Sequence, residues 1–309
     1  MKLDSYLQFL RDIGHDVIDM DGMSWFNPSA FLYSPVLIQA EVRPDTYDLR
    51  KLFRHRCLAI RCATPDPWGR KSYRLVVADP QYGLESLDSK SRNQTRRGLE
   101  ACQVRPVDFL ELAREGLPLH VETMQRQGRK VRSGALDYWK RYFTRAAGVN
   151  CAVAWAAYCN REMAAYVVGF TLERVTHILL VRSATRHLRR YPNNALIFAF
   201  TQHMLATGAA DEVSIGFESL QPQLDSLDHF KEGLGFRRKT VNQYVELTPA
   251  ISRIMRGPIV PAASAALRLL LSPELGGKLT GLLSWCEAQR LAQRTATEPS
   301  ARRQAGGSP

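Results

Sequence analysis

Residues 181–236 read VRSATRHLRRYPNNALIFAFTQHMLATGAADEVSIGFESLQPQLDSLDHFKEGLGF, and this stretch decides the fold. A short apolar strand ends at Val181, and a basic loop leads into an apolar helix over residues 195–207 that stops at Gly208. Residues 212–217 then indicate a buried strand, and residues 227–234 indicate a short helix. Strands that alternate with helices in this way predict an α/β protein.

The loop before the apolar helix joins cationic side chains to a helix start. The first N–H groups of a helix have no partner inside it, so with an asparagine as N-cap they are free to bind a phosphate. Arginine adds paired N–H donors that fit phosphate oxygens. We therefore expect a phosphate-bearing carrier to bind here, the alternative being a solvated loop that only caps the helix; the residues concerned are Arg189, Arg190, Tyr191, Asn193 and Asn194.

Composition bounds the class of protein. A chain of 309 residues with 45% hydrophobic and 23% charged residues suits one large globular domain or two ordinary ones. A formal net charge of +12 favours an anionic partner: CoA, tRNA, a nucleotide-linked sugar or an acidic membrane surface. The acidic N-terminal stretch does not resemble a secretory signal, and no run of ~18 apolar residues predicts a spanning helix. The six cysteines are scattered, so we expect reduced thiols in the cytoplasm.

A second basic segment lies at residues 87–100, LDSKSRNQTRRGLE. Ser89 is the expected N-cap of a helix that places Arg92 and Arg96 four residues apart, with Arg97 beside them. Like charges repel at that spacing. The segment is therefore either a solvated basic face or an anion-binding helix.

Further along the chain, aromatic residues at helical spacing in 136–147 predict a core-facing helix. Apolar runs at 151–158, 164–172 and 177–181, split by short turns, predict an antiparallel meander that feeds the basic loop.

The order of meander, basic loop, apolar helix, strand and the closing phrase HFKEGLGF at residues 229–236 resembles the GNAT acyltransferase fold. More narrowly it resembles the FemAB-like branch, and the basic helix at 87–100 resembles one near the domain junction of that branch. The resemblance implies an α/β (α+β) protein with two GNAT-like domains, each a mixed, mostly antiparallel sheet flanked by helices. The expected limits are residues 1–115 and 116–248, a helical extension at 249–294 and a disordered tail at 295–309.

One departure from the family concerns the carrier. The Gly-rich pyrophosphate turn usual in GNAT enzymes is replaced by a loop with Arg190, Asn193 and Ala195. The resemblance therefore leaves both acyl-CoA and aminoacyl-tRNA as co-substrates, with no permanently bound cofactor and no metal. The implied acceptor is an amine on a small molecule or a cell-envelope precursor.

Site roles follow from the implied geometry, in which the donor carbonyl lies where two parallel strands, 177–181 and 212–217, diverge. Ser183 and Glu218 follow the ends of these strands, where open sheets bind ligands, and Glu218 is the first choice of general base with His229 second. We expect the substrate to be held by Arg92, Arg96, Arg97 and Lys231.

Two other functions stay open on the sequence alone: an RNA-binding protein that uses its basic segments without catalysis, or a silent scaffold that keeps the fold. For residues 251–294 the alternatives are packing against the domain and lying on the inner membrane surface.

Overall fold

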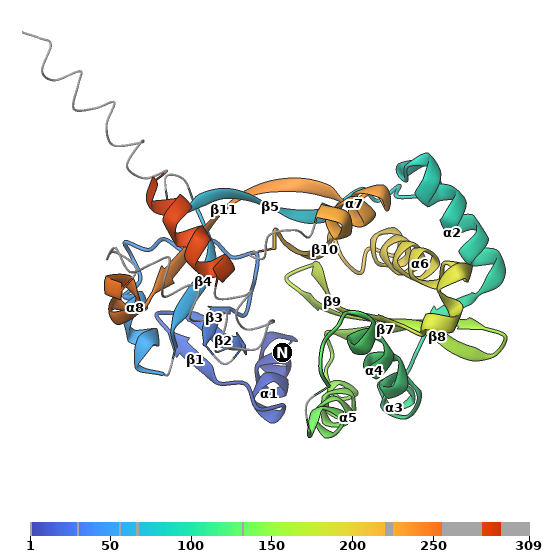
Figure 1. Ribbon diagram of the computed structural model, residues 1–309, viewed down its shortest axis with the longest axis horizontal. Coiled ribbons are helices and arrows are strands. Elements are labelled where there is room, and N and C mark those ends of the chain that lie inside the picture. Colours follow the sequence, from blue (N-terminus) through green and yellow to red (C-terminus); the bar gives the residue numbers. More distant parts are fainter. Residues whose placement is uncertain are drawn as a thin grey trace, which may run out of the picture. The chain divides into compact units, whose positions relative to one another are not determined.

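The computed structural model describes residues 2–29, 31–55, 57–65, 68–131, 133–219, 225–254 and 280–291 (Figure 1). Contacts divide the chain into two compact units whose segments alternate along the sequence. The first unit comprises Met1–Gly14, Arg74–Phe217 and Asp225–Lys239, and the second comprises His15–Tyr73, Glu218–Leu224 and Thr240–Pro309. The predicted domain limits, which fall after residues 115 and 248, stay a prediction.

The sheet of the first unit contains the predicted meander. Its strand order is β5 (Arg70–Val77), β10 (Glu212–Phe217), β9 (Val175–Ser183), β8 (Glu162–Leu172), β7 (Ala152–Cys159) and β6 (Gln103–Pro106). Neighbours from β9 to β6 pair antiparallel, β10 pairs parallel with β9, and β5 pairs antiparallel with β10. A mixed sheet flanked by helices confirms the predicted fold class.

Helices cover both faces of this sheet (Figure 1). One face carries α6 (Pro192–Ala206) and α2 (Ser89–Ala101), with α7 (Asp225–Gly233) later in the chain. The other carries α4 (Leu117–Arg126) and α5 (Ala135–Ala146), preceded by α3 (Phe109–Glu111) and a π-helical turn at Leu112–Gly116. Because α6 lies between the sheet and α2, ten of its 15 residues are buried, which explains why its sequence is apolar on all sides.

Aromatic packing joins α1 (Lys2–Asp12) to the first unit. The ring of Tyr6 lies 4.7 Å from that of Phe170, and the ring of Phe9 lies 5.1 Å from that of Tyr142. The aromatic stripe predicted on α5 is therefore core, as expected, since Tyr142 and Phe143 are both buried.

The strands of the second unit follow the order β1 (Val17–Met20), β2 (Met23–Ser29), β3 (Leu32–Pro35), β4 (Ala59–Thr64) and β11 (Arg237–Leu247). The strands β2 and β3 contain Pro28 and Pro35, although proline disfavours strands. Proline is tolerated there because Pro28 lies at a register irregularity and Pro35 ends its strand.

The remaining short elements are 3-10 turns at Leu49–Arg54, Leu84–Ser86 and Thr185–Arg190, and the helix α8 (Pro249–Ile254). Residues 280–291 are helical and bury Leu282, Leu283 and Trp285 in a cluster with Val245 and Leu247, so this part of the extension packs against the second unit. Residues 255–279 of the predicted extension and the tail at 295–309 lie outside the described residues. Within the described chain, no helix combines the length and apolarity needed to cross a membrane.

Three local predictions were wrong. Asp88, not Ser89, caps α2, because its carboxylate accepts from the Ser91 N–H at 2.6 Å. The helix α6 begins at Pro192, and its N-cap is Tyr191 in the left-handed region at φ 55°, rather than Asn193 or Asn194.

The third wrong prediction concerns the cysteines. Cys102 and Cys159 form a disulfide instead of staying reduced. The register of β6 and β7, which pairs Gln103 with Tyr158, brings these two residues opposite each other across the strands. The other four cysteines are free and buried, and burial raises the pKa of Cys151 to about 11, as expected for an inert thiol.

Candidate functional site

The parallel strands β9 and β10 diverge after a short paired stretch. Their register pairs Val175 with Glu212 and ends where His177 faces Ser214. Beyond His177, β9 continues to Ser183 alongside β8, whereas β10 passes through Gly216 at φ 105°, a conformation that favours glycine. The parallel pair predicted from the sequence is therefore present, with β9 extending beyond it.

A buried ion-pair cluster anchors the start of β10. Arg74 donates to Glu212 at 2.7 Å with both side chains over 90% buried, and Lys239 donates to the second Glu212 oxygen at 2.7 Å. Burial alone would raise the pKa of Glu212, but the two cations outweigh it and lower that pKa below its usual value. Burial, reinforced by the charge of Arg74, lowers the pKa of His177 from 6.5 to about 4.

An open pocket of about 270 Å³ lies at the start of α6 and joins the two basic segments found in the sequence. The guanidinium of Arg97 lies over the ring of Tyr191, 5.0 Å from its centre. The lining residues are Arg97, Glu100, Ala101, Arg189, Arg190 and Tyr191. Three arginines therefore meet at one small surface, which we call the arginine pocket.

A glycine permits this meeting. A Cβ atom on Gly98 of α2 would lie 2.6 Å from the carbonyl oxygen of Tyr191 and 3.0 Å from the Cβ of Ala195. Any larger residue would force α2 away from the start of α6, since backbone cannot rotate aside. Asn194 also donates to Gln94 of α2 at 3.3 Å, so the first turn of α6 is held by α2 on that side.

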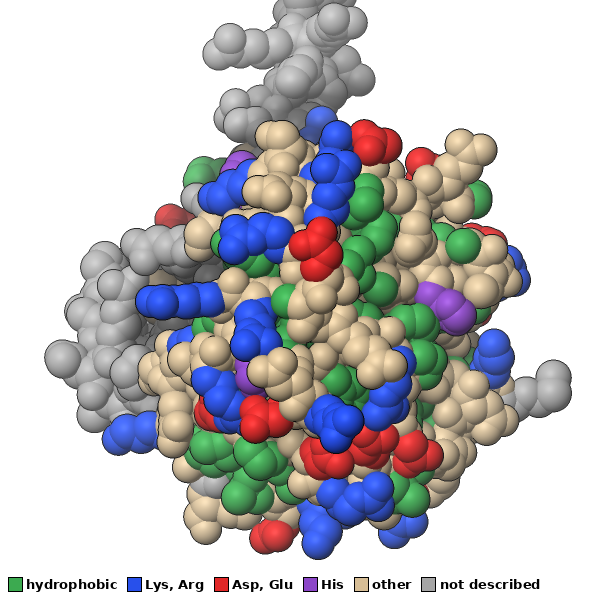
Figure 2. Space-filling model, turned by 90° about the vertical axis from the view of Figure 1, so that its right-hand side faces the viewer, with side chains coloured by type: hydrophobic (Ala, Val, Ile, Leu, Met, Phe, Trp, Pro, Cys, Tyr) green, Lys and Arg blue, Asp and Glu red, His purple; other side chains and the backbone are tan. Residues whose placement is uncertain are grey.

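The cations of the arginine pocket remain largely exposed. Arg97, Arg189 and Arg190 are exposed, and Arg190 donates to the side-chain oxygen of Asn160 at 3.2 Å. Arg96, one turn from Arg92, is exposed too. On the side of the molecule that carries α2, Lys and Arg side chains predominate in the upper part of Figure 2, whereas acidic and basic side chains alternate below; only the upper part suits an anion.

Two predicted carrier-binding residues lie beside this pocket in a closed network. The hydroxyl of Ser183 accepts from Arg126 at 3.0 Å and from Asn193 at 3.2 Å. Thr123 of α4 bonds both the N–H and the carbonyl of Ser183. The network fixes the end of β9 to α4 and to α6, while the side-chain oxygen of Asn193 is buried with no hydrogen-bond partner among the described residues.

Two predicted substrate-binding cations have other partners. Arg92 forms an ion pair with Glu85 at 2.8 Å and donates to the Leu87 carbonyl at 3.1 Å, so it fastens the segment before α2. Lys231 is buried and pairs with Asp228 at 2.9 Å. His229, the second candidate base, is exposed on α7. Their roles at a substrate stay predictions.

Glu218, the first candidate base, belongs to the second unit. Gln243 donates to the Ser72 hydroxyl, which in turn donates to the Glu218 carboxylate at 2.8 Å. Arg61 donates to the Glu218 carbonyl at 2.8 Å and to Gln243 at 2.6 Å. Glu218 is half-buried, and its carboxylate and its carbonyl oxygen are both held by residues of the second unit.

The sequence reasoning missed the residues that organise these surfaces. The side-chain oxygen of Asn160 accepts from Arg190, and Asn160 lies in a tight turn in which it and Arg161 both have positive φ. Arg126 of α4 donates to the Ser183 hydroxyl. Arg182 follows directly on the apolar run at residues 178–181 of β9, and that was a usable signal.

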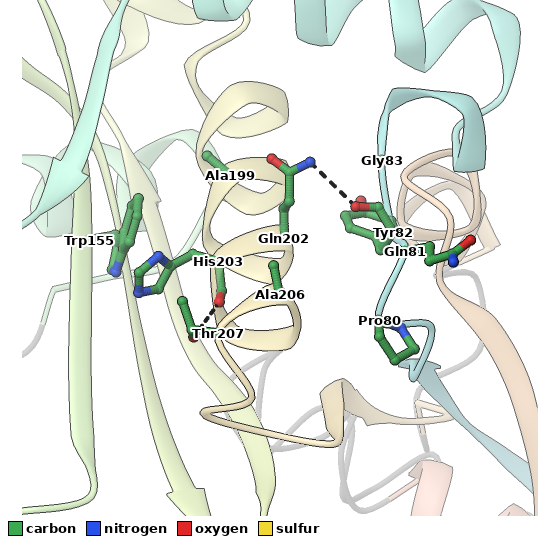
Figure 3. Close-up of a pocket in the computed structure, with 10 residues that line it drawn as sticks. All are labelled: Pro80, Gln81, Tyr82, Gly83, Trp155, Ala199, Gln202, His203, Ala206 and Thr207. Carbon is green, nitrogen blue, oxygen red and sulfur yellow. Dashed lines mark hydrogen bonds between the residues drawn. The ribbon is translucent and has the colours of Figure 1, made fainter.

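A second hollow, about 550 Å³ in volume, lies along the C-terminal half of α6 (Figure 3). Trp155 of β7 stacks near His203, with ring centres 4.9 Å apart, and Gln202 donates to the Tyr82 carbonyl at 3.4 Å across the hollow. None of the predicted site residues lines it.

Comparisons with known proteins support the fold. No family model matches the chain, and no curated protein matches it by sequence. FemX is similar in structure, with a TM-score of 0.54 and 10% identity over 81% of this chain and 93% of that one. The C-terminal domain of a putative lysylphosphatidylglycerol synthetase from Agrobacterium fabrum is similar with a TM-score of 0.53 and 11% sequence identity. The match covers 79% of this chain and 90% of that one.

A third structure, L-PGS from Bacillus licheniformis, gives a TM-score of 0.50 and 13% identity, over 81% of this chain and 89% of that one. The protein thus has the GNAT-like fold in its FemAB-like form.

Proposed function

We propose that this protein is an acyltransferase of the FemAB-like kind that moves an acyl or aminoacyl group from an anionic carrier to an amine. The observation that carries the proposal is the arginine pocket at the start of α6, beside the strand β9 that continues past its pairing with β10. Among the structural neighbours, one is a putative lysylphosphatidylglycerol synthetase by name, which fits a transferase on this fold.

In the proposed reaction the amine nitrogen attacks the carbonyl carbon of a thioester or ester. A new C–N bond forms, the C–S or C–O bond breaks, and the carrier leaves with its sulfur or oxygen, while a base takes the amine proton. Holding the two reactants in place can lower such a barrier by ~7–11 kcal/mol, so the site needs no nucleophile of its own.

The residues divide these tasks. Arg97, Arg189 and Arg190 bind the carrier phosphates through charge-assisted hydrogen bonds. Past His177, the backbone of β9 has no β10 partner on one side in the described chain, and its N–H groups there can bond the carbonyl oxygen as negative charge develops. Glu218 is the proposed base for the amine proton on the strength of its position in the sequence.

The carrier is an acyl-CoA or an aminoacyl-tRNA, and the acceptor is an amine on a small molecule or a cell-envelope precursor. Either carrier presents phosphates to the arginine pocket. A titration of the full chain with CoA, and separately with tRNA, distinguishes the two. Stabilisation by every polyanion alike, with a steep salt dependence, would favour the RNA-binding alternative.

The first test replaces a pocket cation. Arg190→Ala is expected to weaken CoA or tRNA binding about 10-fold, because one charge-assisted hydrogen bond is lost, with the melting temperature unchanged at this exposed site. Arg237→Ala, which removes an exposed arginine from β11, serves as the matched control. Equal carrier affinity in Arg190→Ala and the wild type would remove the pocket from the proposal.

The second test separates binding from chemistry. Glu218→Gln keeps the shape of the side chain and the Ser72 contact but cannot take a proton, so turnover should fall about 10²- to 10⁴-fold with carrier affinity unchanged. Turnover is followed by mass spectrometry of the acylated amine. Full activity in the variant would eliminate Glu218 as the base.

A further inference from the structure

An arginine that has no counter-ion within the described chain lies on the face of the sheet opposite α6. Arg182 is half-buried near the end of β9, where α4 covers the strand. Among the described residues, no carboxylate forms an ion pair with it. Burial lowers the pKa of its guanidinium below the usual value, and the positive charge of Arg129 acts in the same direction.

The guanidinium is held in place with most of its donors unused. Its Nε donates to Nδ1 of His120 at 3.1 Å, and its Nη1 donates to the Val181 carbonyl at 2.9 Å. Two of the five N–H bonds of an arginine are thereby satisfied. The remaining three have no acceptor among the described residues.

His120 is suited to orient this arginine without neutralising it. It is 3% exposed and stacks against Trp139 with ring centres 4.4 Å apart. Burial, followed by the charge of Arg182, lowers the pKa of His120 from 6.5 to about 4, so the ring is neutral near pH 7 and accepts the hydrogen bond. The positive charge of Arg182 therefore remains uncompensated.

A second unused donor lies in the same cluster. The hydroxyl of Tyr166 is fully buried and has no hydrogen-bond partner, and its ring packs edge-on against Phe143 at 5.8 Å. Tyr166 and Tyr142 are electrostatic neighbours of Arg182. Buried donors without acceptors are uncommon in folded proteins, and they are expected where a ligand supplies the missing oxygen.

We propose that Arg182 binds an oxyanion of the acceptor, so that the amine substrate also carries a carboxylate or a phosphate. This proposal rests on the proposed function. The segment of β9 that carries Arg182 lies past its pairing with β10, the same segment whose backbone faces the reacting carbonyl. An anion held there directs the amine of the same molecule toward that segment, and a neutral amine lacks the anchor.

Three amines of similar size test the proposal by isothermal titration of the full chain. O-phosphoethanolamine carries a phosphate, β-alanine carries a carboxylate, and ethanolamine carries neither. We expect one of the two anionic amines to bind about 10- to 100-fold tighter than ethanolamine, and their ranking identifies which oxyanion the site takes.

Two variants assign the effect to Arg182. Arg182→Gln should abolish the preference for the anionic amine without lowering the melting temperature, because it removes a half-buried charge that has no counter-ion among the described residues. Arg141→Gln makes the same charge change at an exposed position of α5 and should leave the preference intact. Tyr166→Phe should weaken the anionic amine only.

Equal binding of all three amines, or a preference that survives Arg182→Gln, would overturn the proposal. So would a loss of the same size in Arg141→Gln. Titration with CoA and tRNA is scored separately. Failure of both carriers to bind would reject the proposed transferase. The binding of the three amines would still decide whether Arg182 forms an anion site.

Discussion

Glu212→Gln is expected to cause one of the largest losses of stability available to a single polar substitution in this chain. Glu212 receives hydrogen bonds from Arg74 and Lys239, and both it and Arg74 are over 90% buried. A glutamine removes the negative charge and leaves the buried Arg74 without a counter-ion. Breaking a buried pair in this way costs about 3–5 kcal/mol.

The size of the effect can be measured by thermal and urea unfolding. For a unit of this size, each kcal/mol corresponds to roughly 2–4 °C in melting temperature, so the expected decrease is about 6–20 °C. Asp211→Asn is the matched control, because the neighbouring carboxylate pairs with Arg174 in an exposed ion pair and its loss should change the melting temperature little.

A double variant separates the buried charge from the lost hydrogen bonds. Arg74→Met combined with Glu212→Met leaves no buried charge unpaired and should regain much of the loss. The reasoning fails if Glu212→Gln costs no more than Asp211→Asn, because the Arg74–Glu212 pair would then be as well solvated as an exposed one.

Two further predictions concern the same unit. Gly98→Ala should weaken carrier binding several-fold, because the added methyl displaces α2 and Arg97 from Tyr191. Gly148→Ala is the control and should leave carrier binding unchanged, because its methyl would meet nothing closer than 3.8 Å. Equal carrier affinity in both variants would refute the packing argument. Because the folded pKa of His177 is about 4 against an ordinary 6.5, the unfolded chain takes up a proton first, and stability should decrease by about 3 kcal/mol as pH falls from 6.5 to 4. His177→Gln should flatten the dependence of the free energy of unfolding on pH, measured by urea unfolding. His229→Gln changes an exposed histidine and is the control. An unchanged dependence in His177→Gln would contradict the prediction.

Most of the first unit could be predicted from sequence because its signals are local. Apolar runs with turn residues between them gave the meander, and the apolar stretch before Gly208 gave α6, which starts three residues earlier than predicted because Tyr191 caps it. The strands β2 and β3 were not predicted, since proline weighs against a strand locally and only pairing partners reveal one.

Features that depend on distant partners could not be read from the sequence. The disulfide follows from the register of β6 on β7. The basic residues of α2 have different partners: Arg97 lines the arginine pocket, whereas Arg92 forms an ion pair with the segment before α2. Lys231 matched a family phrase, yet it lies in a buried pair with Asp228. A sequence pattern shows which residue types are present but not which partners they meet.

The alternation of segments between the two units sets an order for folding during synthesis. The first unit draws on Met1–Gly14 and on Asp225–Lys239, so the ribosome must release most of the chain before that unit holds all of its parts. The α1 helix is synthesised before its aromatic partner on β8, Phe170, which follows more than 150 residues later. Until then its apolar side is open to chaperones, and a nascent chain halted before Phe170 should remain bound to them.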